Sequence, residues 1–229
     1  MCSTVISSTK FANLKRAGYT FFIGNYFNGS LVSDTDTIDG LYQGVNLNGI
    51  NCIKNAKTGG ITQLRDAYHI PQFTTAKPFD YPLVTPTPTN TYAQARKPID
   101  YLNLNGGSIG RTWLVVLNGV GTNWSSNKTL NEAFIREFVS YFPNPLGPQI
   151  GILSTYTDYW NIVGTTFTIY DSNNALPQLW WSDCSTANQD YTGFTPFNNW
   201  YQPVMHRYNC SMTNIAGQSG ANGDLDWFA

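Results

Sequence analysis

Residues 46–70, which read NLNGINCIKNAKTGGITQLRDAYHI, decide the fold. The apolar residues in the first half of this stretch recur at the spacing of one helical face: Leu47, Ile50, Ile53 and Ala56. This spacing predicts a helix over residues 46–57, which the pair Gly59-Gly60 ends. Residues 62–70 then have the composition of a strand. A helix that leads directly into a strand is typical of α/β proteins.

The same alternation extends toward the N-terminus. The β-branched run Thr4-Val5-Ile6 predicts a short strand over residues 3–7, and Ser8-Thr9 then caps a helix that stops at Gly18. The apolar run of residues 19–23 predicts a second strand. The order is therefore strand, helix, strand, helix, strand, which favours parallel strands joined by helical crossovers over a sandwich.

Toward the C-terminus the pattern changes. Helices and strands still alternate at first: helix 92–102, strand 113–117, helix 130–141, strand 149–153 and a short helix through Tyr159-Trp160. From Leu176 onward, short strands follow one another with no helix-length apolar stripe between them: residues 179–181, 203–208 and 225–228. We predict a single α/β domain over residues 1–229, an irregular (β/α) TIM-like barrel with regular β/α units in the first part and mostly β structure in the last.

Six prolines between residues 71 and 98 predict an extended surface loop. The aromatic residues Phe73, Phe79 and Tyr81 favour packing of this loop onto the body of the domain. The alternative is a linker between two domains.

The composition excludes several classes of protein. Charged residues make up 12% and aromatic residues 15% of the 229 residues, with a formal net charge of −1. So much apolar mass excludes intrinsic disorder, and the balanced charge argues against nucleic acid as a partner. The strongly apolar run at residues 113–117 is far shorter than the ~20 residues of a membrane helix, so no membrane insertion is expected. His69 and His206 lack neighbours at metal-ligand spacing, and we predict no metal or other cofactor.

Other features are typical of secreted proteins. The polar surface must come from Asn, Thr, Ser, Gln and Tyr rather than from charged residues. Four N-glycosylation sequences are present, at Asn28, Asn123, Asn127 and Asn209. Residues 1–7 lack the pattern of a signal peptide, and we expect that Met1 replaces a removed leader. We therefore expect a secreted, extracellular glycoprotein.

The four cysteines are also consistent with secretion, because disulfides persist outside the cell, and they allow three pairings. Proximity along the chain favours a disulfide between Cys184 and Cys210, which leaves Cys2 to pair with Cys52. The alternative is one disulfide and one pair of reduced thiols.

Five segments occur in an order that is found in one family of enzymes. They are RTWLVVLNG (111–119), QIGILS (149–154) with Tyr159-Trp160, LPQLWW (176–181), residues 200–208, and DLDWFA (224–229). In these segments the chain resembles glycoside hydrolase family 25, and more closely the amoeba-like and nematode lysozymes of that family. The resemblance implies a (β/α) barrel with a groove at the carboxyl ends of its strands. It also implies cleavage of the β-1,4 bond between N-acetylmuramic acid and N-acetylglucosamine, so a glycan or peptidoglycan is the expected partner.

The resemblance further implies where the catalytic acids should lie, and here the chain departs from the pattern. The first-strand acid falls on Val5 or its neighbours Thr4 and Ile6, and the Asp-x-Glu of the strand that begins at Trp113 falls on Val116 and Asn118. None of these residues carries a carboxyl group. An amide such as that of Asn118 cannot donate a proton at any useful pH. General acid–base catalysis typically contributes about 10²–10⁴-fold, so we predict little hydrolase activity.

Three aspartates are candidates for a rearranged site. Either Asp224 or Asp226 matches the acid that the family carries near its C-terminus, and Asp226 is the better candidate for the groove. Asp66 and Asp183 are the other two candidates. The alternative roles are a buried, hydrogen-bonded strand residue for Asp66 and a loop cap for Asp183.

Aromatic residues are expected to line the groove beside Asp226: Tyr26, Tyr68, Trp181 and Trp227. Because Trp180 and Trp181 are adjacent in one strand, only one of them can face the barrel interior. The sequence thus favours a catalytically degenerate lysozyme-like protein that binds a glycan or self-associates as a structural protein. The alternative is an active N-acetylmuramidase that uses the rearranged aspartates.

Overall fold

The structure is a computed structural model that describes residues 4–29, 44–62, 64–71, 91–119, 122, 124–142, 148–185 and 187–228. Most of the proline-rich stretch therefore lies outside the described residues, although its last proline, Pro98, lies inside a helix. No helix in these described ranges combines the length and the apolar character that crossing a membrane requires.

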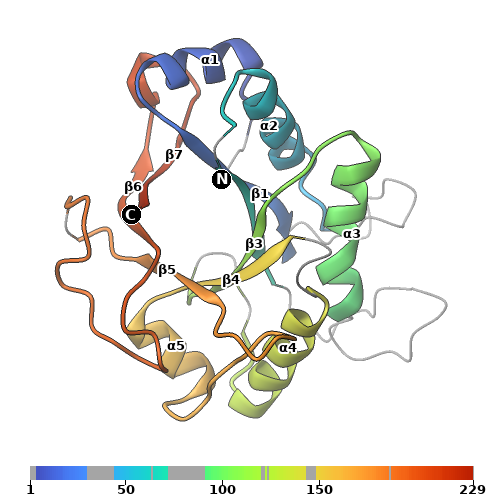
Figure 1. The fold of residues 1–229 in the computed structure, drawn as a ribbon, viewed down its shortest axis with the longest axis vertical. Coiled ribbons are helices and arrows are strands. Elements are labelled where there is room, and N and C mark those ends of the chain that lie inside the picture. The colour runs from blue at the N-terminus through green and yellow to red at the C-terminus, as the bar shows by residue number, and fades with distance from the viewer. Residues whose placement is uncertain are drawn as a thin grey trace.

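A seven-stranded sheet curls through the centre of the molecule (Figure 1). Its strands follow one another in chain order: β1 (Phe21–Asn28), β2 (Leu64–Ile70), β3 (Arg111–Val116), β4 (Gln149–Ser154), β5 (Gln178–Ser182), β6 (Met205–Met212) and β7 (Gly223–Phe228). The first six strands are parallel and β7 is antiparallel to β6. Because β1 and β7 are the two ends of this order, the described strands form an open half-barrel and do not close into the predicted barrel.

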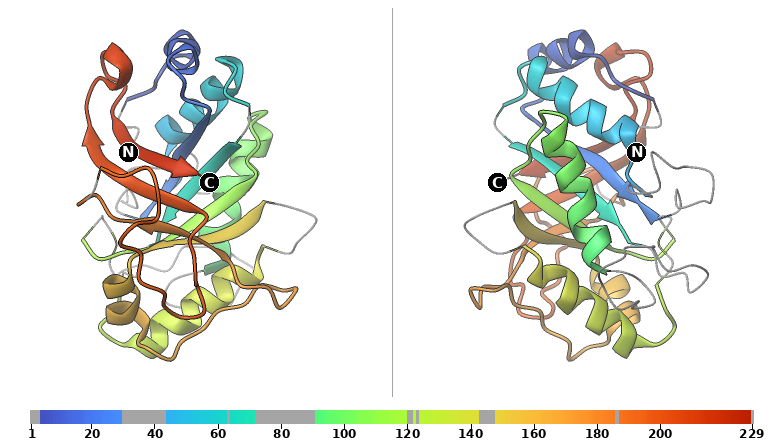
Figure 2. Two further views of the ribbon diagram at one scale, coloured as in Figure 1. Left: turned by 60° about the vertical axis from the view of Figure 1, so that its left-hand side comes forward. Right: turned by 90° about the vertical axis from the view of Figure 1, so that its right-hand side faces the viewer.

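Helices connect the parallel strands from β1 to β5 and cover the outer face of the curl (Figure 2). They are α2 (Leu47–Thr58), α3 (Thr91–Leu104), α4 (Lys128–Ser140) and α5 (Tyr156–Val163). A further helix, α1 (Ser8–Arg16), precedes β1, and a short 3-10 helix, η2 (Ile215–Gly217), lies between β6 and β7. The predicted alternation of helices and strands from α1 to β5, and the mostly β structure after it, are confirmed. Polar side chains begin four of the helices, as the cap of α1 by Ser7 and that of α2 by Asn46 illustrate.

The two faces of the sheet pack differently. Alternate residues of β3 show the division: Leu114 and Val116 pack in the large core formed with the helices, whereas Trp113 and Val115 belong to a separate cluster that contains no helical residue. The second cluster fills the concave, inner face of the curl, together with Leu117, Leu153, Trp180 and Met205. A side chain on this inner face is the kind that can reach a ligand in the half-barrel.

The strand predicted over residues 3–7 is wrong for the residues described, 4–7. The backbone N–H of Ile6 donates to Sγ of Cys52 at 3.3 Å, and its carbonyl oxygen accepts from Nδ2 of Asn55 at 2.9 Å. The polar groups of this segment are thus satisfied by side chains of α2 rather than by a neighbouring strand.

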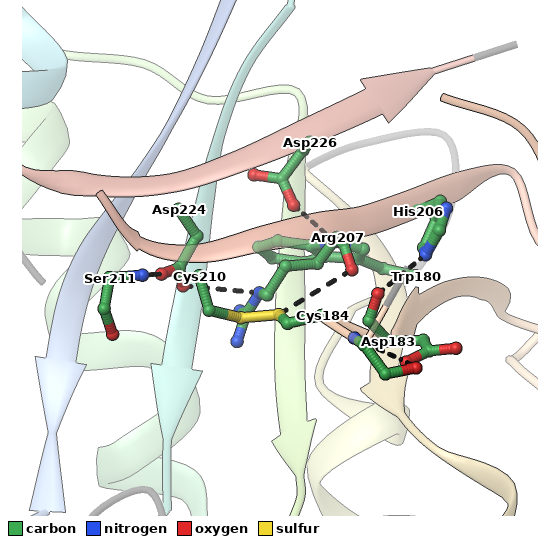
Figure 3. Close-up of a disulfide and its surroundings, with 10 residues drawn as sticks. Trp180, Asp183, Cys184, His206, Arg207, Cys210, Ser211, Asp224 and Asp226 are labelled. Atoms are coloured by element: carbon green, nitrogen blue, oxygen red, sulfur yellow. Dashed lines mark hydrogen bonds and ion pairs between the residues drawn. A yellow bond between two sulfur atoms is a disulfide. The ribbon is translucent and has the colours of Figure 1, made fainter. Parts of the chain in front are cut away.

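One of the two expected disulfides is confirmed. Cys184 and Cys210 are bonded, with a Cα–Cα distance of 5.7 Å, and join the end of β5 to β6 (Figure 3). Cys2 lies outside the described residues, so its pairing with Cys52 stays a prediction.

Candidate functional site

A cavity of about 470 Å³ lies where the sheet fails to close, between β1 and β7. Its wall includes inner-face residues of several strands: Asn25, Tyr68, Trp180, Arg207 and Asp226. Residues of α1, among them Phe11 and Leu14, also line it. The cavity therefore combines aromatic rings with a small number of polar groups, which is the usual make-up of a site for a small ligand.

Asp226 is the central polar residue of this cavity. It pairs with Arg207 in the register of β6 and β7, and its Oδ1 accepts a hydrogen bond from Nε1 of Trp180 at 2.9 Å (Figure 3). Burial raises the pKa of Asp226 to about 7; the charge of Arg207 opposes this rise and that of Asp224 adds to it. Near neutral pH the group is therefore divided between its acid and its carboxylate form.

Arg207 links the other members of the cluster. Its guanidinium lies over the ring of Trp180, with Cζ 4.8 Å from the ring centroid, and its Nε lies 3.4 Å from Oδ2 of Asp224. Oδ1 of Asp224 accepts from the backbone N–H of Ser211 at 2.8 Å. Asp224 is thus held as the partner of Arg207, while Asp226 is held by the indole.

Asp66, the second candidate acid, lies elsewhere. It is fully buried, accepts from Nε1 of Trp113 at 2.9 Å, and is not among the residues that line the cavity. Burial raises its pKa to about 6, against the hydrogen bond from Trp113 and the charge of Arg111. The neighbouring Arg111 opens β3 and pairs with Gln149, which opens β4, so this cluster belongs to the amino ends of the strands. Asp66 therefore has the alternative role, that of a buried, hydrogen-bonded strand residue.

Asp183, the third candidate, holds a turn. Its Oδ1 accepts from the backbone N–H of Ser185 at 2.9 Å and from the hydroxyl of Ser185 at 2.6 Å. This is the loop-cap role, and Asp183 does not line the cavity. Of the three candidate acids, only Asp226 lies in the cavity wall.

The positions expected to carry the family acids are apolar, or hold an amide. Val116 is fully buried in the outer core, and the inner-face residues beside it are Val115 and Leu117. Val5 is 44% exposed in the segment before α1. At the carboxyl end of β3, therefore, the side chains directed into the half-barrel, Val115 and Leu117, carry no charge.

Asn118 instead contacts an acid that the sequence reasoning missed. Its Nδ2 donates to Oδ1 of Asp158 at 3.0 Å. Asp158 lies in the first turn of α5, where Thr155 caps the helix and donates its hydroxyl to Oδ2 of Asp158 at 3.1 Å. The spacing Thr155-x-x-Asp158 is a capping-box pattern and could have identified this residue from the sequence.

The four aromatic residues expected in the groove divide into two pairs. Tyr68 and Trp227 line the cavity. Tyr26, in contrast, is fully buried in the outer core, where its hydroxyl contacts Oγ1 of Thr112 at 2.8 Å. Trp181 points to the outer face and stacks on His206 with ring centroids 4.2 Å apart. The tryptophan of β5 that faces the cavity is Trp180, because alternation along the strand allows only one of the pair to do so.

The expected glycosylation positions differ in access. Asn28 is 2% exposed, so an oligosaccharide transferase cannot reach it in the folded chain. Asn127 is exposed at the start of α4, and its Oδ1 accepts from the backbone N–H of Thr129 at 3.0 Å. Asn209 is partly buried in β6, and Asn123 lies outside the described residues.

The two histidines are both buried. His69 stacks on Phe27 at 4.3 Å in the outer core, and burial lowers its pKa to about 3. The ring nitrogens of His206 face the carbonyl oxygens of Asp190 and Asp183, at 2.7 and 3.0 Å. In the part of the chain that the structure describes, no three His, Cys, Asp or Glu side chains lie together as metal ligands would.

A curled α/β half-barrel with a carboxylate and aromatic rings on its concave face matches the class of protein that the sequence resembles. The family model described as "Lysozyme-like protein 1" matches residues 2–208, and the chain belongs to this lysozyme-like family.

Relatives from two organisms agree with this assignment. The chain is 27% identical over 214 residues to Lysozyme-like protein 5 of Caenorhabditis elegans, covering 93% of this chain and 84% of the relative. It is 25% identical over 226 residues to Probable GH family 25 lysozyme 2 of Dictyostelium discoideum, covering 99% and 88%. These relatives support a glycoside hydrolase-like function.

A solved structure shows the same fold. GHIP, a glycosyl hydrolase 25 of Streptococcus pneumoniae, superimposes with a TM-score of 0.54 over 97% of this chain and 93% of its own, at 11% sequence identity.

Proposed function

We propose that this protein is a secreted, lysozyme-like glycan-binding protein that has lost the glycosidase reaction. The observation that carries the proposal is the wall of the cavity. The carboxylates that line it among the described residues, Asp224 and Asp226, lie on the single strand β7, and the inner-face positions at the end of β3 are Val115 and Leu117.

A glycosidase needs two carboxyl groups that flank the bond to be cleaved, about 5–9.5 Å apart. Asp224 and Asp226 are two residues apart on one strand, so both approach a ligand from the same wall. The facing wall of β1 and β2 contributes Asn25 and Tyr68, neither of which is an acid. One acid with no partner across the ligand can orient a sugar but lacks the second group that cleavage requires.

The same cavity retains what sugar binding needs. Trp180 and Trp227 offer aromatic surface, and Arg207, Asp226 and Asn25 offer hydrogen-bonding groups. Mixed aromatic and polar walls suit a sugar ring, which has apolar faces and a polar rim. The disulfide between Cys184 and Cys210 supports secretion, because such bonds persist in oxidising compartments.

One observation favours a second candidate, an active lysozyme. Asp226, with its pKa near 7, holds a proton at the pH where a general acid works, and Asp224, ion-paired with Arg207, lies on the same strand. If a ligand could enter between the two groups, they would supply an acid and a carboxylate.

Lysis and binding assays separate the two candidates. Purified protein is mixed with bacterial cell walls, turbidity is followed, and the bound fraction is measured by co-sedimentation. We expect binding without a fall in turbidity, and loss of binding in Trp227→Ala. Tyr201→Ala is the matched control, because Tyr201 is 81% exposed and does not line the cavity.

Clear lysis that disappears in Asp226→Asn would overturn the proposal and establish the active lysozyme. Neither lysis nor binding, together with self-association in sizing experiments, would indicate the structural role instead.

A further inference from the structure

Asn25 is a residue of the cavity wall with an unused hydrogen-bond donor. It lies in the second half of β1, is 1% exposed, and is among the residues that line the cavity. Its Oδ1 accepts from Nδ2 of Asn46 at 2.9 Å, whereas its own Nδ2 has no hydrogen-bond partner among the described residues. A buried donor without a partner is costly, and most are satisfied by the protein, by water or by a ligand.

The orientation of this amide is fixed by its neighbours. Asn46 caps α2 by accepting from the backbone N–H of Gly49 with its Oδ1, which leaves its Nδ2 to donate to Asn25. Gly49 also lets α2 approach β1 so closely that a Cβ at position 49 would overlap the backbone carbonyl oxygen of Asn25. Oδ1 of Asn25 is therefore held toward Asn46, and Nδ2 is the end that is left without a partner among the described residues.

The charges of the cavity select against anions. The charged residues that line it in the described part of the chain are Arg207, Asp224 and Asp226. The guanidinium of Arg207 is already paired with Asp224, so Asp226 is the unbalanced charge. A ligand with its own carboxylate would meet a like charge in a confined site and no unpaired cation.

A neutral ligand with a strong acceptor fits these groups. We propose that the cavity binds neutral, N-acetylated glycans of the chitin type, with an acetamido carbonyl oxygen accepting from Nδ2 of Asn25. We further propose that it discriminates against glycans that carry a free lactyl carboxylate on muramic acid, a group that the stem peptide converts to an amide in a cell wall. An amide oxygen is a better acceptor than a sugar hydroxyl, and Asp226 accepts from ligand N–H or O–H groups. This inference rests on the proposed glycan-binding function and names the class of glycan.

Three tetrasaccharides of equal length test it by isothermal titration calorimetry at pH 7. Chitotetraose is neutral and acetylated, cellotetraose is neutral without acetamido groups, and a tetrasaccharide of alternating N-acetylglucosamine and N-acetylmuramic acid is acetylated and anionic. We expect chitotetraose to bind the wild-type protein at least tenfold more tightly than either of the others.

Variants assign the selectivity to Asn25. Asn25→Ala should weaken chitotetraose binding about tenfold and leave cellotetraose binding unchanged, because only the acetamido contact is lost. Asn103→Ala, at an exposed position on α3 outside the cavity, should change neither.

Several outcomes would overturn the inference. Equal loss of affinity for chitotetraose and cellotetraose in Asn25→Ala would make Asn25 a structural residue only. If that variant does not fold, equal binding of the two neutral glycans by the wild-type protein would reject the acetamido contact. Equal or tighter binding of the muramic acid glycan would reject the charge argument while leaving glycan binding intact. If the protein binds none of the three tetrasaccharides but still binds cell walls, this inference alone is refuted. If it binds neither the tetrasaccharides nor cell walls, the proposed function is refuted as well.

Discussion

Trp113 and Trp180 meet edge to face on the inner face of the sheet, with ring centroids 5.6 Å apart and ring planes at 71°. Each donates its indole N–H to an aspartate at a distance of 2.9 Å: Trp113 to Asp66, and Trp180 to Asp226. The two acids thus have closely similar partners, but only Asp226 lines the cavity. Asp66 is therefore expected to affect stability, and Asp226 is expected to affect ligand binding.

Asp66→Asn should stabilise the protein at high pH and not at low pH. Burial raises the pKa of Asp66 from 3.8 to about 6, so the folded state holds this proton more tightly than the unfolded state does. Stability is therefore lost as pH rises from about 4 to about 6, and the full loss persists above that range. The asparagine keeps an acceptor for Trp113 and cannot ionise. We expect a gain in the free energy of unfolding of about 3 kcal/mol at pH 8.

Urea denaturation at pH 4 and pH 8 measures this effect, with Asp183→Asn as a control on a surface turn. An equal gain for Asp66→Asn at both pH values would show that ionisation is not its cause.

Asp226 should make glycan affinity depend on pH. Its pKa is raised to about 7, so the carboxylate that accepts ligand hydrogen bonds forms as pH rises through 7. We expect the Kd of chitotetraose to fall several-fold between pH 5.5 and pH 8.5. Asp226→Asn should give a flat profile, and titration calorimetry across this range compares the two proteins. An unchanged profile in the variant would assign the pH dependence to another group.

Restoring carboxylates at Val116 and Asn118 should not restore cleavage. Val116 is fully buried against the helices, so Val116→Asp places a charge in an apolar core and should destabilise the fold by more than about 3 kcal/mol. Asn118→Glu is at an exposed position just after β3, but it replaces the amide that donates to Asp158 with a second carboxylate, so we expect a smaller loss of stability there. Thermal unfolding and the turbidity assay test each variant separately. A stable, lytic double variant would show that this strand can present both acids to the cavity.

The sequence predicted the order of helices and strands because their periodicities are local. It did not predict which alternate residues of a strand face the cavity. The sequence favours Trp181 as the groove residue, whereas Trp180 lines the cavity. The resemblance places a catalytic acid at Val116, whereas Val116 packs in the outer core and Val115 and Leu117 face inward. A shift of one residue reverses both faces of a strand, and adjacent tryptophans or valines give no sign of which face is which. Neighbouring strands and helices settle that choice, and they are distant in sequence.

His206 should control the segment that borders the cavity. Its ring nitrogens lie within hydrogen-bond distance of the carbonyl oxygens of Asp183 and Asp190, which flank the loop after β5. The same loop contributes Gln189 to the cavity wall, and Tyr191 packs edge-on against Trp227 with ring centroids 4.9 Å apart. Loss of the imidazole removes both attachments.

We expect His206→Ala to speed amide hydrogen exchange in residues 187–191 about tenfold or more, while exchange in α4 stays unchanged. Chitotetraose affinity should fall with it, because Gln189 and Trp227 lose a fixed position. Tyr170→Phe is the control, since it removes only a hydroxyl that accepts from Asn199 at 3.2 Å, and Tyr170 does not line the cavity. Exchange that rises equally throughout the chain in His206→Ala would instead mean that the histidine stabilises the whole fold rather than this segment.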